Sequence, residues 1–236
     1  MELDKLTEWL WCLRSEHVQA YAVVGADGVY LVDTSTGDQQ EPMLRLLAQE
    51  LGVQVRDVPL REIVLTHGHP DHTGSAAALA RATRAQVLGP AAEESIIAGE
   101  QPQGKPDLLD WERPLYKQSM AALSPAEPLR LDVGLRPGDP LAWPKAAELV
   151  AAPGHTSGQL VVWFPEDRVL LAADAMASHE GRPMLGVFNV DRAQAIDSFE
   201  RLCELPAEIA CFGHGDPVME SAQTRLREVA AALQPG

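Results

Sequence analysis

Cysteine is scarce in this sequence. The chain has three cysteines, and none of them belongs to a Cys-x-x-Cys pair. Because the number is odd, we do not expect a disulfide framework. Cys211 lies in the apolar run 209–212. We therefore expect it to be a small buried hydrophobe, and we extend the same interpretation to Cys12 and Cys203.

Long hydrophobic runs are absent as well. No stretch approaches the roughly 18 uninterrupted apolar residues that a membrane span needs. The first eight residues, MELDKLTE, carry acidic residues early and lack a basic region followed by an apolar one. They do not have the pattern of a secretory signal. We therefore expect no membrane partner and a cytoplasmic protein.

The sequence has few positively charged residues. The 19 lysines and arginines face 34 aspartates and glutamates, which gives a formal net charge of −15. An acidic surface repels phosphate backbones, and the sequence has no lysine or arginine cluster to offset this. We expect a small-molecule substrate and no nucleic-acid partner. The oligomeric state stays open, with a homodimer among the options.

What the sequence does contain is an alternation of strand and helix patterns. This order predicts an α/β fold with helices on the outer faces of its sheets. The Asp-Gly pair at 27–28 predicts a hairpin between strands 18–24 and 29–33. Further strands are expected over 62–66, 86–89, 148–152, 159–164, 168–173 and 208–212, and helices over 41–51, 75–86, 192–205 and 220–233.

The length of 236 residues suits one large domain or two small ones, and the 46% hydrophobic content is enough for a substantial core. We expect a single domain over 1–236 with two similar halves, about 1–135 and 136–236. Several prolines interrupt residues 91–128, so helical pieces and loop that form one wall of a pocket are expected there. His17 precedes a strand and is expected to be structural.

Three of the seven histidines fall within six residues, in the run His67-Gly68-His69-Pro70-Asp71-His72. Imidazole and carboxylate are the usual ligands of zinc and related divalent ions. Gly68 and Pro70 favour a tight turn. Such a turn can direct the first two histidines at one ion and the Asp-His pair at another.

Four of the candidate ligands follow predicted strands. His67 ends the strand 62–66, and His155 comes after 148–152. Asp174 ends 168–173, and His214 follows 208–212. Any one of these residues alone would be interpreted as a loop residue or a cap. Together they would converge at the edge of the sheets where binding sites of such folds lie.

The motif His-x-His-x-Asp-His followed by separate His, Asp and His resembles that of the metallo-β-lactamase fold superfamily. The resemblance covers nearly the whole chain, including Asp33-Thr34, 153–158 and 213–215. It implies a four-layer αββα sandwich with two divalent metal ions at one edge. Zinc is expected, with manganese and iron(II) as alternatives. It also implies a ligand set in which Asp174 bridges a first metal, held by His67, His69 and His155, and a second, held by Asp71, His72 and His214.

The function implied is that of a binuclear metal-dependent hydrolase. A metal-bound hydroxide would act on a small ester, thioester or lactone, with Asp71 and Asp174 as the catalytic carboxylates. Thr66, Ser157 and Asp33 are candidates for fixing the imidazole tautomers. His179 and Tyr116 are candidates for substrate contact, and Trp111, Met120, Met176, Met184 and Phe188 for an apolar wall.

Several positions differ from the better-known branches of this superfamily, and these differences limit the branches to which the chain can be similar. Ala177 stands where lactone-hydrolysing relatives carry tyrosine, and Asp174 stands where zinc β-lactamases tend to carry cysteine or serine. His69 replaces the glutamate of the flavodiiron branch. The Gly-Arg-Thr-Asp-like segment of glyoxalase II and persulfide dioxygenases is absent, and the glutathione-binding helical domain of glyoxalase II is expected to be missing. The interpretation that remains is a glyoxalase-II-like hydrolase that is not assigned to any of these branches.

Three other interpretations stay open. One is a mononuclear iron enzyme related to persulfide dioxygenases, since that group keeps most of the same ligands. Another is a metal-dependent phosphodiesterase; within that class, nuclease activity is disfavoured by the acidic charge. The third is a binding protein on a degraded catalytic scaffold, which the intact ligand set disfavours.

The ligand assignment predicts that His69→Ala abolishes hydrolysis and leaves the fold largely intact, because it removes one imidazole from the metal. Turnover should be measured together with the metal content of the same sample. Unchanged turnover in that sample would refute the assignment.

Overall fold

A computed structural model describes residues 1–16 and 18–233, which form two compact units. Unit 1 comprises Met1–Pro102, Ser124–Leu135 and Ala142–Lys145. Unit 2 comprises Gln103–Leu123, Arg136–Leu141 and Ala146–Gly236. His17, expected to be structural, lies outside the described residues.

Unit 1 contains a seven-stranded sheet whose spatial order follows the sequence. Its first four strands pair antiparallel and the remaining ones are added in parallel. The predicted hairpin and the strands expected at 62–66 and 86–89 are confirmed. The strands are β1 (Glu2–Lys5), β2 (Leu10–Arg14), β3 (Gln19–Gly25), β4 (Gly28–Val32), β5 (Leu60–Val64), β6 (Gln86–Pro90) and β7 (Val133–Leu135).

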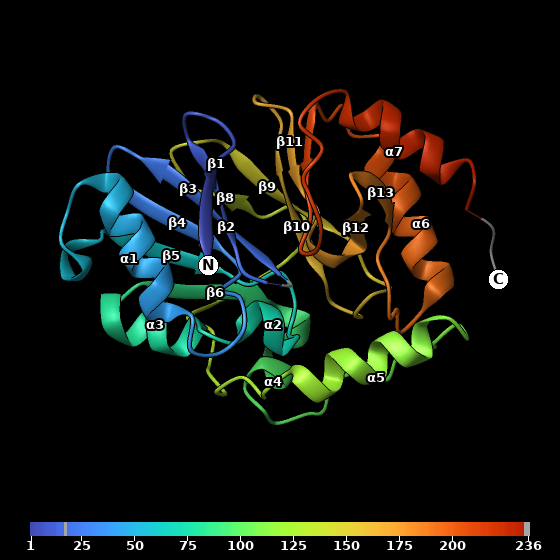
Figure 1. The fold of residues 1–236 in the computed structure, drawn as a ribbon, viewed down its shortest axis with the longest axis horizontal. Helices are drawn as coiled ribbons and strands as arrows, with labels where there is room; N and C mark the ends of the chain where they lie inside the picture. The colour runs from blue at the N-terminus through green and yellow to red at the C-terminus, as the bar shows by residue number, and fades with distance from the viewer. Residues whose placement is uncertain (17, 234–236) are drawn as a thin grey trace. The chain divides into compact units, whose positions relative to one another are not determined.

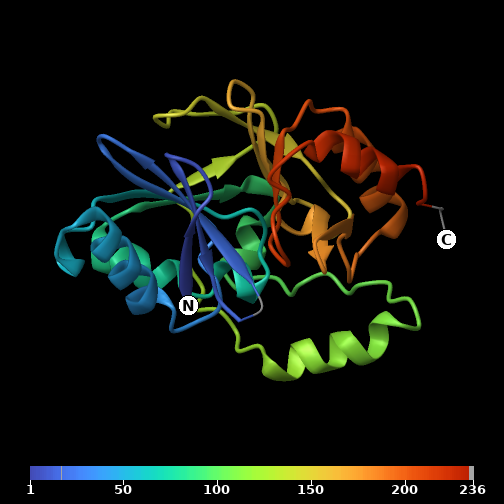
Figure 2. The ribbon, with the colours of Figure 1, turned by 45° about the horizontal axis from the view of Figure 1, so that its top comes forward.

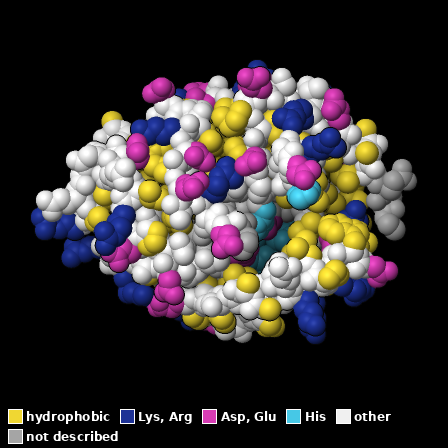
Figure 3. Space-filling view, viewed as in Figure 1, with side chains coloured by type: hydrophobic (Ala, Val, Ile, Leu, Met, Phe, Trp, Pro, Cys, Tyr) yellow, Lys and Arg dark blue, Asp and Glu magenta, His cyan; other side chains and the backbone are white. Residues whose placement is uncertain are grey.

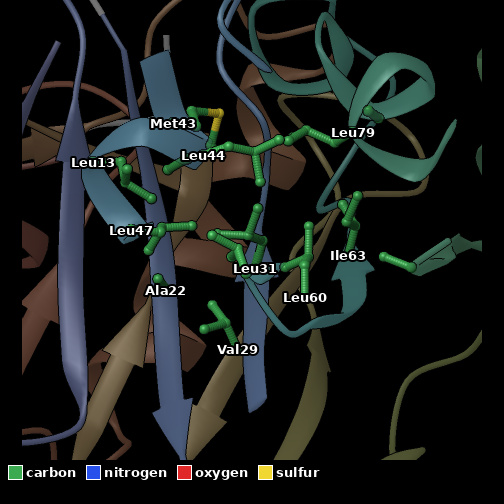
Figure 4. Close-up of a cluster of buried hydrophobic side chains, with 14 of the residues drawn as sticks. Leu13, Ala22, Val29, Leu31, Met43, Leu44, Leu47, Leu60, Ile63 and Leu79 are labelled. Carbon is green, nitrogen blue, oxygen red and sulfur yellow. The ribbon is translucent and has the colours of Figure 1, made fainter. Parts of the chain in front are cut away.

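Two helices cover a face of this sheet, α1 (Gln40–Leu51) and α3 (Ala76–Thr83) (Figure 1). Buried side chains of α1 and α3 pack with side chains of β2 to β6, and the close-up in Figure 4 shows those from β2 to β5. Gly52 ends α1 in the left-handed conformation that glycine adopts without cost. Short turns complete the unit: η1 (Val55–Asp57), α2 (Pro70–Thr73), η2 (Ala91–Glu93) and α4 (Glu94–Ile97).

Unit 2 is built around a five-stranded sheet of order β14-β11-β10-β9-β8. Only the pair β11 and β14 is parallel within it. Helices α6 (Arg192–Cys203) and α7 (Ala222–Ala230) lie side by side and contribute to its buried core (Figure 1). The strands are β8 (Pro140–Leu141), β9 (Ala147–Ala151), β10 (Leu160–Phe164), β11 (Val169–Leu171) and β14 (Ile209–Cys211).

Unit 2 also holds elements that the sequence pattern did not predict. A separate hairpin, β12 (Met176–His179) and β13 (Arg182–Leu185), follows the turn η3 (Ala173–Ala175). Helix α5 (Glu112–Ala122) is one of the helical pieces expected in 91–128, and Figure 2 shows it in light green. Most of its residues are exposed, so α5 lacks the apolar face of a core helix.

None of the three cysteines forms a disulfide and all three are buried, as expected. Burial raises the pKa of the Cys203 thiol to about 12, so this thiol stays protonated at neutral pH. Among the described residues, no helix is long and apolar enough to cross a membrane.

The packing of α1 on the sheet generates a stability prediction. Leu47 is fully buried in the core of unit 1, so Leu47→Ala should lower the free energy of unfolding by about 2–5 kcal/mol through lost burial and a cavity. Denaturant titration measures this, with Gln49→Ala on the exposed face of the same helix as the control. Equal stability of the two variants would contradict this account of the core.

Candidate metal centre

In unit 1 the predicted ligands lie on the turn after β5. His67 and His72 are fully buried, whereas His69 and Asp71 are partly exposed. His69 precedes α2, a short helix that the sequence did not predict, and Pro70 occupies its first turn. The turn places four potential ligand side chains within one short segment.

The side chains of this turn come together in pairs. The Nε2 atom of His67 lies 3.1 Å from Nδ1 of His69. The ring of His72 packs against that of His67 with 4.2 Å between centroids. Asp71 Oδ2 lies 3.9 Å from His72 Nε2. The pairing of His67 with His69 and of Asp71 with His72 is the one expected from their spacing.

Asp33 organises two of these histidines. One of its carboxylate oxygens accepts the backbone N–H of Thr66 at 2.8 Å. The other accepts the Thr66 hydroxyl and Nδ1–H of His72, each at 2.8 Å. Because the Thr66 hydroxyl gives its only proton to Asp33, its oxygen can only accept from Nδ1 of His67, 3.0 Å away. In the neutral form of both imidazoles Nε2 therefore carries the lone pair, which is the form that a metal requires.

A second buried carboxylate, Glu93, supports the same turn. It is fully buried and accepts the backbone N–H of Gly68 at 2.7 Å. This bond fixes the peptide between the first two histidines. Sequence reasoning missed Glu93, although its place shortly after β6 follows the same strand-end pattern as the ligands.

In unit 2 three of the predicted ligands meet at one carboxylate oxygen. Oδ2 of Asp174 lies 3.4 Å from Nε2 of His155 and 3.3 Å from Nε2 of His214. His155 and Asp174 are buried, and His214 is partly exposed. Asp174 thus stands between two imidazoles, each of which presents Nε2 to it.

The tautomer of His155 is set by a backbone group. Its Nδ1 lies 3.0 Å from the carbonyl oxygen of Val187. A carbonyl can only accept, so Nδ1 carries the proton and Nε2 the lone pair. Ser157, a candidate for this role, is exposed. The sequence could not point to the Val187 carbonyl, because every residue has a backbone carbonyl.

The hydrogen bonds of the histidines indicate whether these residues suit a metal. Three imidazoles have Nδ1 bonded within the protein and Nε2 directed at another ligand side chain. His72 and His155 donate this Nδ1–H to a carboxylate and to a carbonyl, the usual partners of ligating histidines, and His67 donates it to the Thr66 hydroxyl. The described residues therefore offer His/Asp groups that could hold a divalent metal ion.

The two candidates for substrate contact lie in unit 2. The ring of Tyr116 on α5 packs edge-to-face on that of Phe188, with 5.1 Å between centroids. Both side chains are partly exposed, and Trp111 beside them is 53% exposed. His179 ends β12 and is exposed. Met176 is fully buried in the core, which leaves it no surface to offer a substrate.

Comparison with known proteins identifies the family. Residues 14–214 match the metallo-beta-lactamase superfamily, and the chain belongs to it. The expected family and its α/β fold are thereby confirmed.

Curated relatives are named as hydrolases. The chain is 30% identical to hydroxyacylglutathione hydrolase of Rhodobacter capsulatus over 206 residues, which cover 86% of this chain and 63% of the relative. It is 25% identical to probable metallo-hydrolase YybB of Bacillus subtilis, covering 86% of this chain and 82% of the relative. The chain therefore spans less than two thirds of the first of these proteins.

Solved structures share the fold. A metallo-beta-lactamase family protein from Thermus thermophilus is 27% identical with a TM-score of 0.69, covering 97% of this chain and 80% of that chain. A class B3 di-zinc metallo-beta-lactamase from an Alaskan soil metagenome is 16% identical with a TM-score of 0.73, covering 99% and 92%. The second likeness shows the fold alone.

The contacts of Asp33 predict a large cost for its removal. Asp33→Ala would leave three buried donors unpaired, so the free energy of unfolding of the metal-free protein should fall by about 3 kcal/mol or more. Asp33→Asn keeps one oxygen as an acceptor, so its free energy of unfolding should lie between those of the wild type and Asp33→Ala. Denaturant titration, with the exposed Asp57→Ala as control, measures both. A loss below about 1 kcal/mol for Asp33→Ala would contradict this role.

Proposed function

We propose that this chain is a metal-dependent hydrolase in which both units contribute to one binuclear centre and act as a single metallo-β-lactamase-fold domain. The first ion would be held by His67, His69 and His155, the second by Asp71, His72 and His214, with Asp174 between them. The ions proposed are zinc, with manganese and iron(II) as alternatives.

One observation supports this proposal above the others. The Nδ1 atoms of His67, His72 and His155 are each held by an oxygen of the protein, which reserves Nε2 for a metal. One such bond alone also occurs in proteins without a metal, but three histidines with the same nitrogen engaged favour a shared role for Nε2. The family to which the chain belongs and the hydrolase names of its relatives agree with this interpretation.

Divalent ions in such a site supply Lewis acidity and hydroxide at neutral pH. The protein's own contribution is to position and to move protons. Asp71, whose side chain is 22% exposed, can take up a proton and pass it to solvent. Asp174 is buried, so its carboxylate would stay fixed between the two imidazoles. We assign the catalytic roles to these two aspartates.

The substrate class proposed is a small ester, thioester or lactone. The thioester option has the support of relatives named hydroxyacylglutathione hydrolase. Tyr116 and the neighbouring Phe188 would offer an aromatic surface to an apolar part of the substrate. His179, exposed at the end of β12, is proposed as a further substrate contact.

A small-molecule substrate also suits the charge of the protein. The net charge is −15. On the face shown in Figure 3, aspartate and glutamate side chains lie among the lysine and arginine side chains. On this face the described residues form no continuous basic track for a polyanion.

Metal removal tests the proposed function. Treatment with a chelator should abolish turnover of a panel of thioesters, lactones, aryl esters and bis-aryl phosphates, and added zinc or manganese should restore it. The panel also identifies the substrate class. Activity that persists in a sample shown to be metal-free would refute the mechanism.

Metal analysis of the same protein separates the proposal from the dioxygenase alternative. Zinc or manganese at a ratio near two per chain supports the hydrolase, as the two proposed ligand groups require. A single iron, with oxygen consumption on a persulfide substrate, would support the dioxygenase instead.

A further inference from the structure

The segment Gln103–Leu123 packs against a loop that contacts two proposed metal ligands of unit 2. The loop is 186–190, between β13 and α6, and Figure 2 shows it reaching the segment before α5. The N–H of Asp107 donates to the carbonyl of Asn189 at 2.8 Å. The loop is therefore held from the side by residues far away in the sequence.

Glu112 is the buried group of this contact. Its side chain lies at the start of α5 and the residue is only 1% exposed. One carboxylate oxygen accepts the backbone N–H of Leu109 at 2.8 Å. The other accepts the backbone N–H of Phe188 at 3.2 Å. Phe188 has a φ of +60°, in the left-handed region that bulky residues rarely adopt. The loop conformation at Phe188 thus needs support from outside, and Glu112 supplies a hydrogen bond there.

The N–H of Phe188 belongs to the same peptide group as the carbonyl of Val187. That carbonyl accepts Nδ1–H of His155 at 3.0 Å. A peptide is planar, and the chain has no cis peptide among its described residues, so the N–H and the C=O point in opposite directions. One rigid peptide therefore has Glu112 bonded to its hydrogen and His155 bonded to its oxygen.

We propose that Glu112 is a positioning residue for His155, acting through the Val187–Phe188 peptide. The carboxylate fixes the plane of this peptide and polarises it, so its oxygen becomes a stronger acceptor. The carbonyl then keeps the proton of His155 on Nδ1 and leaves Nε2 for the metal. This inference rests on the proposed function, because it takes His155 to be a metal ligand.

A purely local role for Glu112 would be that of a helix cap. Its bond to the N–H of Leu109, three residues earlier, resembles the glutamate arm of a capping box, although it lies in the turn just before Trp111, the N-cap residue of α5. A cap alone would influence the helicity of α5 and would leave the imidazole of His155 unchanged. The two roles therefore differ in a measurable property of a residue outside α5.

The test is Glu112→Gln in the full-length protein, since an amide can accept from only one of the two N–H groups. We expect the ¹⁵N shifts of the His155 ring in the metal-free protein to move from the Nδ1–H tautomer toward a mixture. Zinc affinity, measured by competition with a chromophoric chelator, should fall about 10- to 100-fold. Wild-type ring shifts and wild-type affinity in a folded Glu112→Gln protein would overturn the proposal.

The matched control is Asp110→Asn, which removes the same charge from an exposed side chain two residues earlier. It should behave as the wild type. If Glu112→Gln does not fold, Glu112→Asp takes its place, because its shorter side chain cannot reach both N–H groups that Glu112 holds. The same change in the His155 ring shifts and the same loss of zinc affinity are expected for this variant. Wild-type values of both would overturn the proposal.

His155→Ala separates this inference from the proposed function. Wild-type zinc binding by His155→Ala would show that His155 is not a ligand and would refute the proposed function. Lost zinc binding in His155→Ala, with Glu112→Gln equal to Asp110→Asn, would refute only the role of Glu112.

Discussion

The carboxylate of Asp33 is the contact on which the ligand turn of unit 1 depends. It follows β4, where its own N–H bonds to Val64 of the neighbouring strand β5. With φ at +61° the backbone leaves the sheet and turns the side chain toward Thr66 and His72. Short polar side chains tolerate this conformation better than others do. The end of the sheet and the orientation of two imidazoles are thus set by one residue.

A common rule governs the contacts that orient the histidines. His67 and His72 are held through Asp33, and His155 is held through a backbone carbonyl. Glu93 adds a bond to the peptide between two ligands. None of these groups is itself a proposed ligand, yet each limits the positions that a ligand side chain can take. A metal that binds such a turn loses little free energy to ordering it.

The proposed ligands were predictable from the sequence because their signal is local. His67, His69, Asp71 and His72 lie in one short run, and each remaining ligand follows a strand whose apolar pattern is visible. The supporting contacts have no such signal. The hydrogen bond from Phe188 to Glu112 joins residues 76 positions apart, and that from His155 to Val187 joins residues 32 apart. They depend on tertiary packing and not on any pattern of residue types.

The distinction between local sequence patterns and tertiary contacts also explains which strands were predicted. Strands that are long, apolar and bounded by turn residues, such as β3 and β10, were found. Strand β2 is buried along most of its length and therefore lacks the alternation that marks a half-buried strand. Strand β13 contains Pro183, and β12 pairs only with it in a separate two-stranded sheet. Neither has a periodicity that sequence reasoning can detect.

The division of the chain has a consequence for its biosynthesis. Gln103–Leu123 belongs to unit 2, but the residues on either side of it belong to unit 1. The ribosome therefore releases this segment well before the loop around Phe188 exists. Until then Tyr116, whose ring packs on Phe188 in the folded protein, has no such partner. A segment that lacks its packing partner during synthesis is open to aggregation and to chaperones.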